Sequence, residues 1–277
     1  MHWRFLDTGF HTGDYNLALD AAMAKSGFCD QPTLRVFRWQ PFCISLGYHQ
    51  NAAEIEAEKC ALAGIDVARR PTAGRAILHA EELTYSVVIP ASHPWFEMLP
   101  LDFYRRISEA IAAGLQNLGI DTQFTPGEKL HHEGRPLRLS CFASAARNEI
   151  AVQGKKVVGS AQRRFREGVL QHGSIILHDG HERLIDFLIG ESAALAAESL
   201  RLQEHTTSLS RIAEREVTFE ETVYALQCGF ERVLGAVFTE GHVLPEENEL
   251  AEAWRERYRI ISTNQQEVRL CENSAPY

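Results

Sequence analysis

The six cysteines of this 277-residue chain include no C-x-x-C pair. Zinc ribbons and thioredoxin-like redox motifs need that spacing, and disulfide frameworks belong to short secreted chains that are rich in cysteine. The absence argues against all three classes of protein. We therefore expect most of the cysteines to be small buried side chains, so a catalytic cysteine needs support from its own neighbourhood.

Three further absences each exclude a kind of partner or location. No apolar run reaches the roughly 18–20 residues that cross a bilayer. The segment Met1–Asp7 has neither the apolar stretch nor the cleavage site of a signal peptide. The formal net charge of -9 lacks the cationic excess that general nucleic-acid binding needs. We expect a soluble, cytoplasmic protein with no membrane and no nucleic acid as partner.

The common signatures of enzyme classes are missing as well. The chain has no Walker A motif, no G-x-G-x-x-G and no G-x-S-x-G, which argues against P-loop, Rossmann and serine-hydrolase proteins. His178 and His181 are close in sequence, but no third ligand accompanies them, so we expect no metal site.

Hydrophobic spacing predicts a mixture of helices and strands. The clearest helix covers residues 102–118, and Thr218 with Glu221 predicts a capping box at the start of a later one. Strands 33–39 and 43–48 are expected to pair across Gln40-Pro41, and strands 148–152 and 156–160 through Gln153-Gly154. Further helices are expected over 15–25, 51–63 and 248–258, and further strands over 65–70, 83–89 and 173–178.

These elements predict an α+β fold, in which helices pack on a mixed or antiparallel sheet. The pattern changes at about Thr206, after which helical stripes dominate. We therefore expect a main domain over residues 1–205 and a small, mainly helical C-terminal segment over residues 206–277.

Positive charges gather in two short segments of this acidic chain. They form either two solvated strand ends or one positively charged surface at the entrance of a site, suited to anionic substrates and acidic partner proteins. The residues concerned are Arg69, Arg70, Arg75, Lys155, Lys156, Arg163, Arg164 and Arg166.

Within the first segment, Arg69 to His79 forms a turn of small residues between basic ones. Such a turn brings backbone N–H groups close to an oxyanion, although a tight turn with a solvated basic flank explains the pattern equally well. In the second, Lys155 and Lys156 precede Gly159-Ser160 on a strand. Because strand residues alternate, at most one of the two lysines points inward.

Cys141 lies among small polar residues where a loop meets a strand. A thiol with an ordinary pKa of about 8.5 is only about 3% ionised at pH 7, so a catalytic cysteine needs a cation beside it. Lys156, across the predicted hairpin, is the natural candidate. His172 is either a base or ligand, or a histidine hydrogen-bonded at the start of a strand.

Taken together, these segments resemble the lipoate/biotin protein ligase catalytic-domain family, from the opening strand to about Leu188. The motifs that carry the resemblance are Asn16 to Asp20, Ser45 to Gln50, Arg69 to His79, Leu83 to Ser86, Lys156 to Gln162 and Gln171 to Ser174. The resemblance implies the fold of that family, with residues 1–205 as its catalytic domain.

Two chemistries occur on this fold, and the chain looks more like the LipM-type octanoyltransferases than like lipoate-protein ligase A. Arg75 stands where ligases usually carry a further glycine, and Ser140-Cys141-Phe142 lies where the transferase nucleophile lies. Ala73 departs from the glycine that is common in both groups. The alternatives are an ATP- and Mg-dependent lipoate-protein ligase that uses Lys156, and a non-catalytic protein that binds lipoyl domains.

The resemblance also implies roles and partners. Cys141 and Lys156 would be catalytic, and the substrate-binding residues would be Arg70, Gly74, Arg75, His79, Gly159, Ser160 and His172. Octanoyl-acyl carrier protein would be the donor. A lipoyl-domain protein, either the glycine cleavage H protein or a dehydrogenase E2 subunit, would be the acceptor. No cofactor is expected; ATP and Mg enter only with the ligase alternative.

Overall fold

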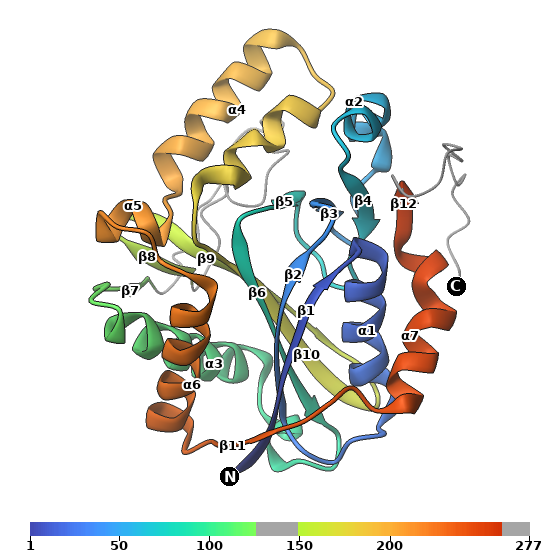
Figure 1. Ribbon diagram of the computed structural model, residues 1–277, viewed down its shortest axis with the longest axis vertical. Coiled ribbons are helices and arrows are strands. Elements are labelled where there is room, and N and C mark those ends of the chain that lie inside the picture. Colours follow the sequence, from blue (N-terminus) through green and yellow to red (C-terminus); the bar gives the residue numbers. More distant parts are fainter. Residues whose placement is uncertain (126–148, 262–277) are drawn as a thin grey trace.

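An eight-stranded sheet runs through the middle of the molecule, in the order β11-β1-β2-β6-β10-β9-β8-β7 (Figure 1). The computed structural model describes residues 1–125 and 149–261. β1 runs parallel to β2 and to β11, and the remaining neighbours are antiparallel. The strands of this sheet are β1 His2–His11, β2 Thr33–Trp39, β6 Glu82–Pro90, β7 Gln123–Thr125, β8 Glu149–Val152, β9 Lys155–Arg164, β10 Gly168–Ile176 and β11 Val237–Glu240.

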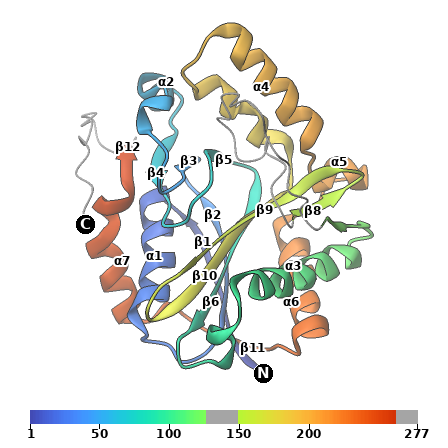
Figure 2. The ribbon, with the colours of Figure 1, turned by 180° about the vertical axis from the view of Figure 1, so that it is seen from behind.

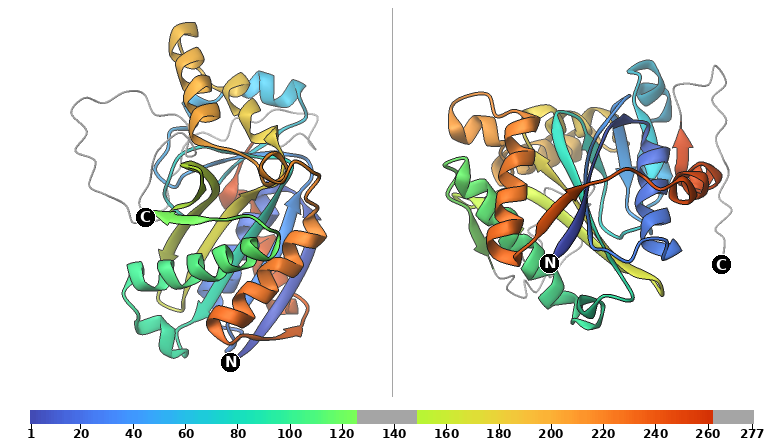
Figure 3. Two further views of the ribbon diagram at one scale, coloured as in Figure 1. Left: turned by 90° about the vertical axis from the view of Figure 1, so that its left-hand side faces the viewer. Right: turned by 60° about the horizontal axis from the view of Figure 1, so that its bottom comes forward.

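Helices cover both faces of this sheet, which confirms the predicted α+β architecture (Figure 3). α3 (Pro100–Asn117) and α6 (Phe219–Leu234) pack on one face, and α1 (Gly13–Ser26) and α7 (Pro245–Tyr258) on the other. The alternation of strand side chains explains this arrangement. Trp3 and Phe5 of β1 join the α3/α6 core, whereas Leu6 joins the α1/α7 core. Burial of each such side chain contributes about 1.5–3 kcal/mol.

The predicted hairpin is confirmed: it joins β8 to the long strand β9, and both are labelled in Figure 2. Gln153 and Gly154 both have positive φ, 51° and 78°, which is the geometry of a two-residue type I′ turn. Beyond the turn, Ala151 pairs with Lys156 but Ile150 pairs with Val158. Val157 is therefore the extra residue of a β-bulge on β9.

A second, four-stranded sheet has the order β12-β4-β3-β5. Its strands are β3 Cys43–Leu46, β4 Asp66–Arg69, β5 Ile77–His79 and β12 Arg259–Ile261. The predicted pairing of residues 43–48 with 33–39 is wrong. Both edges of β2 are already occupied, by β1 and by β6, so β3 passes into the second sheet, where it pairs with β4 and β5.

The helix predicted over residues 51–63 is also wrong as a single element. Asn51 caps a short 3-10 turn, η1 Ala52–Glu54, by accepting a hydrogen bond from the Ala53 N–H. The chain then extends at Ile55, which bridges to Leu188, before α2 begins (Ala57–Leu62). The backbone groups of Glu54 and Glu56 bond to Ile189 and Phe187 across this bridge, so they interrupt the helix.

The elements after residue 205 share the cores of the elements before it. Phe230 of α6 lies in the same core as Phe103 of α3, and β11 extends the large sheet beside β1. The predicted capping box of Thr218 and Glu221 is confirmed at the start of α6. The division of the chain at residue 206 stays a prediction.

The remaining elements lie between β6 and α3 or between β10 and α6. They are η2 Pro94–Glu97, η3 Asp179–Phe187, α4 Ser192–His205 and α5 Leu209–Ala213. α4 projects from one end of the molecule (Figure 1). Among the described helices, none has the length and apolar character that a membrane span requires.

Candidate active site

A pocket lies on the face of the large sheet that carries α1, at the side where the second sheet joins it. Its apolar wall comes from Leu17, Phe37, Trp39 and Ile77. Five of the predicted site residues also line it, namely Arg70, His79, Gly159, Ser160 and His172. Two short runs of the large sheet, 159–161 of β9 and 172–174 of β10, border the pocket, while Val169 and Ile175 of β10 lie in the opposite core.

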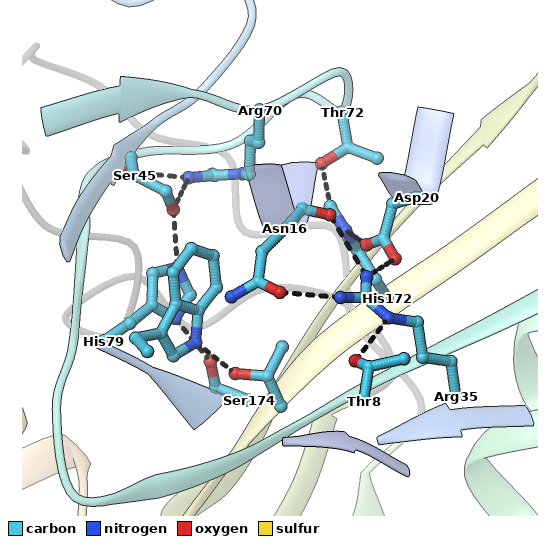
Figure 4. Close-up of polar contacts among 12 residues, drawn as sticks. Thr8, Asn16, Asp20, Arg35, Ser45, Arg70, Thr72, His79, His172 and Ser174 are labelled. Atoms are coloured by element: carbon cyan, nitrogen blue, oxygen red, sulfur yellow. Dashed lines mark hydrogen bonds and ion pairs between the residues drawn. The ribbon is translucent and has the colours of Figure 1, made fainter. Parts of the chain in front are cut away.

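Arg70 holds the turn between β4 and β5 in shape (Figure 4). One guanidinium nitrogen donates to the backbone oxygen and hydroxyl of Ser45, at 2.9 and 3.1 Å. The other donates to the carbonyl oxygens of Ala73 and Arg75, at 3.2 and 2.7 Å. The side chain is buried, so these charge-assisted bonds fix the turn from within.

Gly74 allows the turn to approach the end of β3. Its φ of 115° is a conformation that suits glycine. A Cβ added to Gly47 would lie 1.9 Å from the carbonyl oxygen of Gly74, so the two backbones touch without room for a side chain. The small residues of both motifs thus serve this close contact.

His79 belongs to a buried polar group at the pocket wall. Its Nε2 lies 2.7 Å from the Ser45 hydroxyl, and its Nδ1 lies 2.7 Å from Oε1 of Glu82. The Ser174 hydroxyl donates to the same carboxylate oxygen at 2.8 Å. Trp39 stacks on the imidazole with a centroid distance of 4.1 Å. The ring of His79 is therefore fixed on every side.

His172 belongs to a second buried polar group beside the pocket, whose contacts Figure 4 shows. Its Nε2 lies 2.7 Å from the Thr72 hydroxyl, and its Nδ1 lies 2.9 Å from Oδ2 of Asp20. Arg35 donates to Oδ1 of Asp20 at 2.7 Å and to Oδ1 of Asn16 at 2.6 Å. Burial lowers the pKa of His172 although Asp20 acts to raise it. Both ring nitrogens of His172 are therefore hydrogen-bonded, in the middle of β10 rather than at the start of a strand, and its role stays a prediction.

The neighbouring lysines point in opposite directions, as predicted. The Lys155 ammonium donates to the carbonyl oxygen of Gln203 in an exposed position, at 2.9 Å, whereas Lys156 is buried. The bulge at Val157 matters here, because it leaves both Val157 and Val158 in the α3/α6 core. Lys156 and Gly159 consequently share the opposite face, on which the pocket lies. Cys141 is outside the described residues.

The structure brings one arginine of the second basic segment to the turn of the first, whereas the side chains of Lys155, Arg164 and Arg166 bond elsewhere. Arg163 of β9 donates to the carbonyl oxygen of Pro71 at 2.6 Å, and its guanidinium lies 4.4 Å from the ring centre of Tyr48. Arg69 donates to the carbonyl oxygen of Gln50 at 2.6 Å. The half-buried Arg75 makes no ion pair with any residue of the described ranges 1–125 and 149–261. These residues form a cationic rim around the turn.

Several residues of the site were not singled out in the sequence. Thr72, Ser45 and Asp20 lie inside the recognised motifs, but they were not assigned roles. The clearest missed signals are Arg35, a charge in the middle of an apolar strand, and Glu82, a carboxylate at the start of another. A buried charge needs a partner, so each predicts a polar group on a neighbouring element. No cluster of metal-ligating side chains occurs in the described part of the chain.

Residues 12–231 match the family model described as the lipoyl protein ligase A/B catalytic domain, and the chain belongs to that family. Its similar relatives include octanoyltransferase LipM of Kyrpidia tusciae, which is 40% identical over 92% of this chain and 96% of the relative. Octanoyltransferase LipM of Bacillus subtilis is 36% identical over 83% of this chain and 85% of the relative. Both relatives agree with the resemblance to the octanoyltransferase branch of the family.

The fold agrees with a solved structure as well. A bipartite lipoate protein ligase from Thermoplasma acidophilum, described with its E2 lipoyl domain, superposes with a TM-score of 0.77. It is 24% identical in sequence, and the alignment covers 93% of each chain. This likeness confirms the predicted fold.

Proposed function

We propose that this protein is an octanoyltransferase that moves an octanoyl group from acyl carrier protein to a lysine of a lipoyl domain, through a thioester on Cys141. The observation that carries the proposal is its similarity to LipM octanoyltransferases along most of both chains. The pocket supports it, because an apolar wall beside fixed polar groups suits an acyl chain that ends in a reactive carbonyl.

The reaction consists of two acyl transfers. The Cys141 thiolate attacks the carbonyl carbon of the donor thioester, and the carbon–sulfur bond to the carrier breaks. The pantetheine sulfur leaves as a thiolate, which takes up the proton that Cys141 released when it ionised. The amine of the acceptor lysine then attacks the acyl-cysteine, forms an amide and releases the thiol of Cys141. The Lys156 ammonium stabilises the thiolate and the oxyanion that forms at each step. Burial of Lys156 on the pocket face supports this role, because a cation acts more strongly away from water.

The cationic rim supports an acidic donor protein. Arg75 and Arg163 lie on the turn and strand that border the pocket, where the phosphate of a pantetheine arm would pass. Charges at the rim of an interface mainly raise the rate of encounter and specify the partner. The acceptor in this proposal is the H protein of glycine cleavage or a dehydrogenase E2 subunit.

ATP has no part in the proposed reaction. The first step exchanges one thioester for another, and the second gains the free energy of converting a thioester to an amide. The thiolate of Cys141 must stay reduced between cycles, which suits a cytoplasmic enzyme.

Mass spectrometry after incubation with octanoyl-acyl carrier protein and no ATP tests the proposal. We expect an octanoyl adduct that hydroxylamine removes, that Cys141→Ala abolishes, and that passes to an added lipoyl domain. If Cys141→Ala carries as much adduct as the wild type, the cysteine mechanism is wrong. Labelling of the acceptor that needs free octanoate and ATP identifies a ligase instead, and binding of the lipoyl domain without labelling identifies a non-catalytic protein.

The two adjacent lysines provide a matched pair of variants. Lys156→Ala should lower the rate of adduct formation by at least 100-fold, because one oxyanion-stabilising group is worth about 10²–10³ in rate. Lys155→Ala removes the same charge from the same hairpin, but from its exposed side, and should keep the rate within about twofold. Equal effects of the two substitutions would contradict the role of Lys156.

A further inference from the structure

A buried chain of hydrogen bonds links the turn over the pocket to the centre of the molecule. It runs from Thr72 to His172, from His172 to Asp20 and from Asp20 to Arg35, over distances of 2.7, 2.9 and 2.7 Å. We call these four residues the buried relay. Their elements are distant in sequence: the turn after β4, then β10, α1 and β2 (Figure 4). None of the four is more than 6% exposed.

The direction of each hydrogen bond in the relay follows from the charges. Burial acts to raise the pKa of Asp20, but the hydrogen bond from His172 and the charge of Arg35 outweigh it, and the pKa is lowered. Asp20 is therefore an ionised acceptor, and Nδ1 of His172 carries the proton between them. His172 has a lowered pKa because it is buried, so the ring is neutral at pH 7 and its Nε2 has no proton. Thr72 must then be the donor to Nε2.

We propose that His172 is a positioning residue that holds the Arg70–Arg75 turn over the acyl pocket. Its Nε2 accepts a hydrogen bond from the Thr72 hydroxyl, in the one tautomer that Asp20 and Arg35 impose. Arg70 fixes the shape of the turn from within, but its bonds to Ser45 reach only the neighbouring strand β3. The bond from Thr72 attaches the turn to β10 of the large sheet from inside the molecule, beside the bond from Arg163 of β9 to Pro71 at the pocket rim. The purpose of the turn, binding the octanoyl donor, rests on the proposed function.

The relay has no free nitrogen for proton transfer. Nδ1 of His172 is engaged by Asp20 and Nε2 by Thr72, and both partners are buried. This distinguishes His172 from a general base, which needs a bare nitrogen directed at the substrate. The residue acts through Thr72 on the position of the turn.

Protonation of His172 would break the relay at Thr72. A protonated imidazole donates from both nitrogens, so Nε2 no longer accepts and the buried Thr72 hydroxyl loses its acceptor. The charged groups that face His172 are Asp20, which favours the protonated ring, and Arg70 and His79, which oppose it. Since the pKa is lowered from 6.5, the relay is intact at neutral pH and opens on the acid side of that value. The KM for the donor should therefore rise as the pH falls below about 6.5.

Kinetics of three variants between pH 5.5 and 8, with octanoyl-acyl carrier protein as donor, test this role. Thr72→Val should raise the KM at pH 7.5 about tenfold, because it removes one buried hydrogen bond, with kcat within about twofold of wild type. It should also abolish the rise in KM at acid pH. Thr72→Ser keeps the hydroxyl and should keep both properties, and Thr239→Val, on the exposed β11, is the control.

NMR of the wild-type protein with ¹⁵N-labelled histidine gives a readout that does not depend on activity or on the folding of a variant. We expect His172 at pH 7 to be neutral with the proton on Nδ1. A proton on Nε2 overturns the inference, and so does a Thr72→Val variant with wild-type KM and acid response. If the wild type forms no octanoyl adduct but shows this tautomer, the proposed function fails while the relay stands.

Discussion

Glu247 of α7 forms a buried ion pair with Arg4 of β1, and loss of its charge should weaken the whole fold. The two side chains are 1% and 8% exposed, and their paired bonds measure 2.7 and 2.9 Å. At an effective dielectric constant of about 20, two unit charges about 4 Å apart attract by about 4 kcal/mol. Removing one partner of a buried pair costs about 3–5 kcal/mol, because the other charge stays buried without compensation.

We therefore expect Glu247→Gln to lower the free energy of unfolding by about 3–5 kcal/mol. For a chain of this size that corresponds to a fall in Tm of roughly 6–20 °C. Denaturation in urea, followed by circular dichroism, measures the change. Glu249→Gln, an exposed residue of the same helix, should change stability by less than about 0.5 kcal/mol.

A double-mutant cycle separates the ion pair from other effects. The pair Arg4→Met and Glu247→Leu removes both charges, so it should cost less than the sum of the single changes by at least about 2 kcal/mol. Additive effects, or a loss below about 1 kcal/mol for Glu247→Gln, would refute the reasoning. The outcome also bears on the site, since α7 packs on α1, which carries Asp20.

Three other predictions concern the turn, acid stability and the cysteines. Gly47→Ala should lower kcat/KM at least tenfold, because its Cβ would lie 1.9 Å from the Gly74 oxygen and the turn must shift. Gly190→Ala is the control and should be tolerated, because its Cβ meets only a flexible leucine side chain. Because the folded pKa of Asp20 is below the unfolded value near 3.9, its stabilisation is complete above about pH 4 and is lost as the pH falls through the folded pKa. Urea unfolding of Asp20→Asn should accordingly vary less with pH below 4 than that of the wild type. Burial raises the pKa of Cys60 to about 12 and that of Cys43 well above its usual value. Iodoacetamide at pH 8 should therefore label the partly exposed Cys29 and Cys228 in the native protein, and Cys43 and Cys60 only after unfolding. Peptide mass mapping measures which cysteines are modified.

Local pattern alone predicted much of the fold and part of the site. The spacing of apolar residues located α3, the capping box of Thr218 and Glu221 located the start of α6, and Gln153-Gly154 located the hairpin. These features depend on interactions between residues that are neighbours in the chain, so the local sequence is enough to predict them. The order of the motifs likewise identified the family.

Pairings between distant segments could not be predicted in this way. Residues 43–48 were expected to pair with β2, but β1 and β6 occupy both edges of β2. The residues of segment 33–48 do not indicate that these two distant strands pair there instead. Asp20, Arg35 and His172 meet only because α1, β2 and β10 converge, although a charge in the middle of an apolar strand implied that Arg35 has some partner.

Lys155 and Lys156 show the same division between sequence and tertiary structure. Strand alternation by itself determined that the two lysines point to opposite faces, because successive side chains of any strand do so. Only the tertiary structure decided that Lys156 shares a buried sheet face with Gly159, which lines the pocket. The bulge at Val157 reverses the alternation between Lys156 and Gly159, and a bulge forms where the packing of two neighbouring strands makes room for one extra residue.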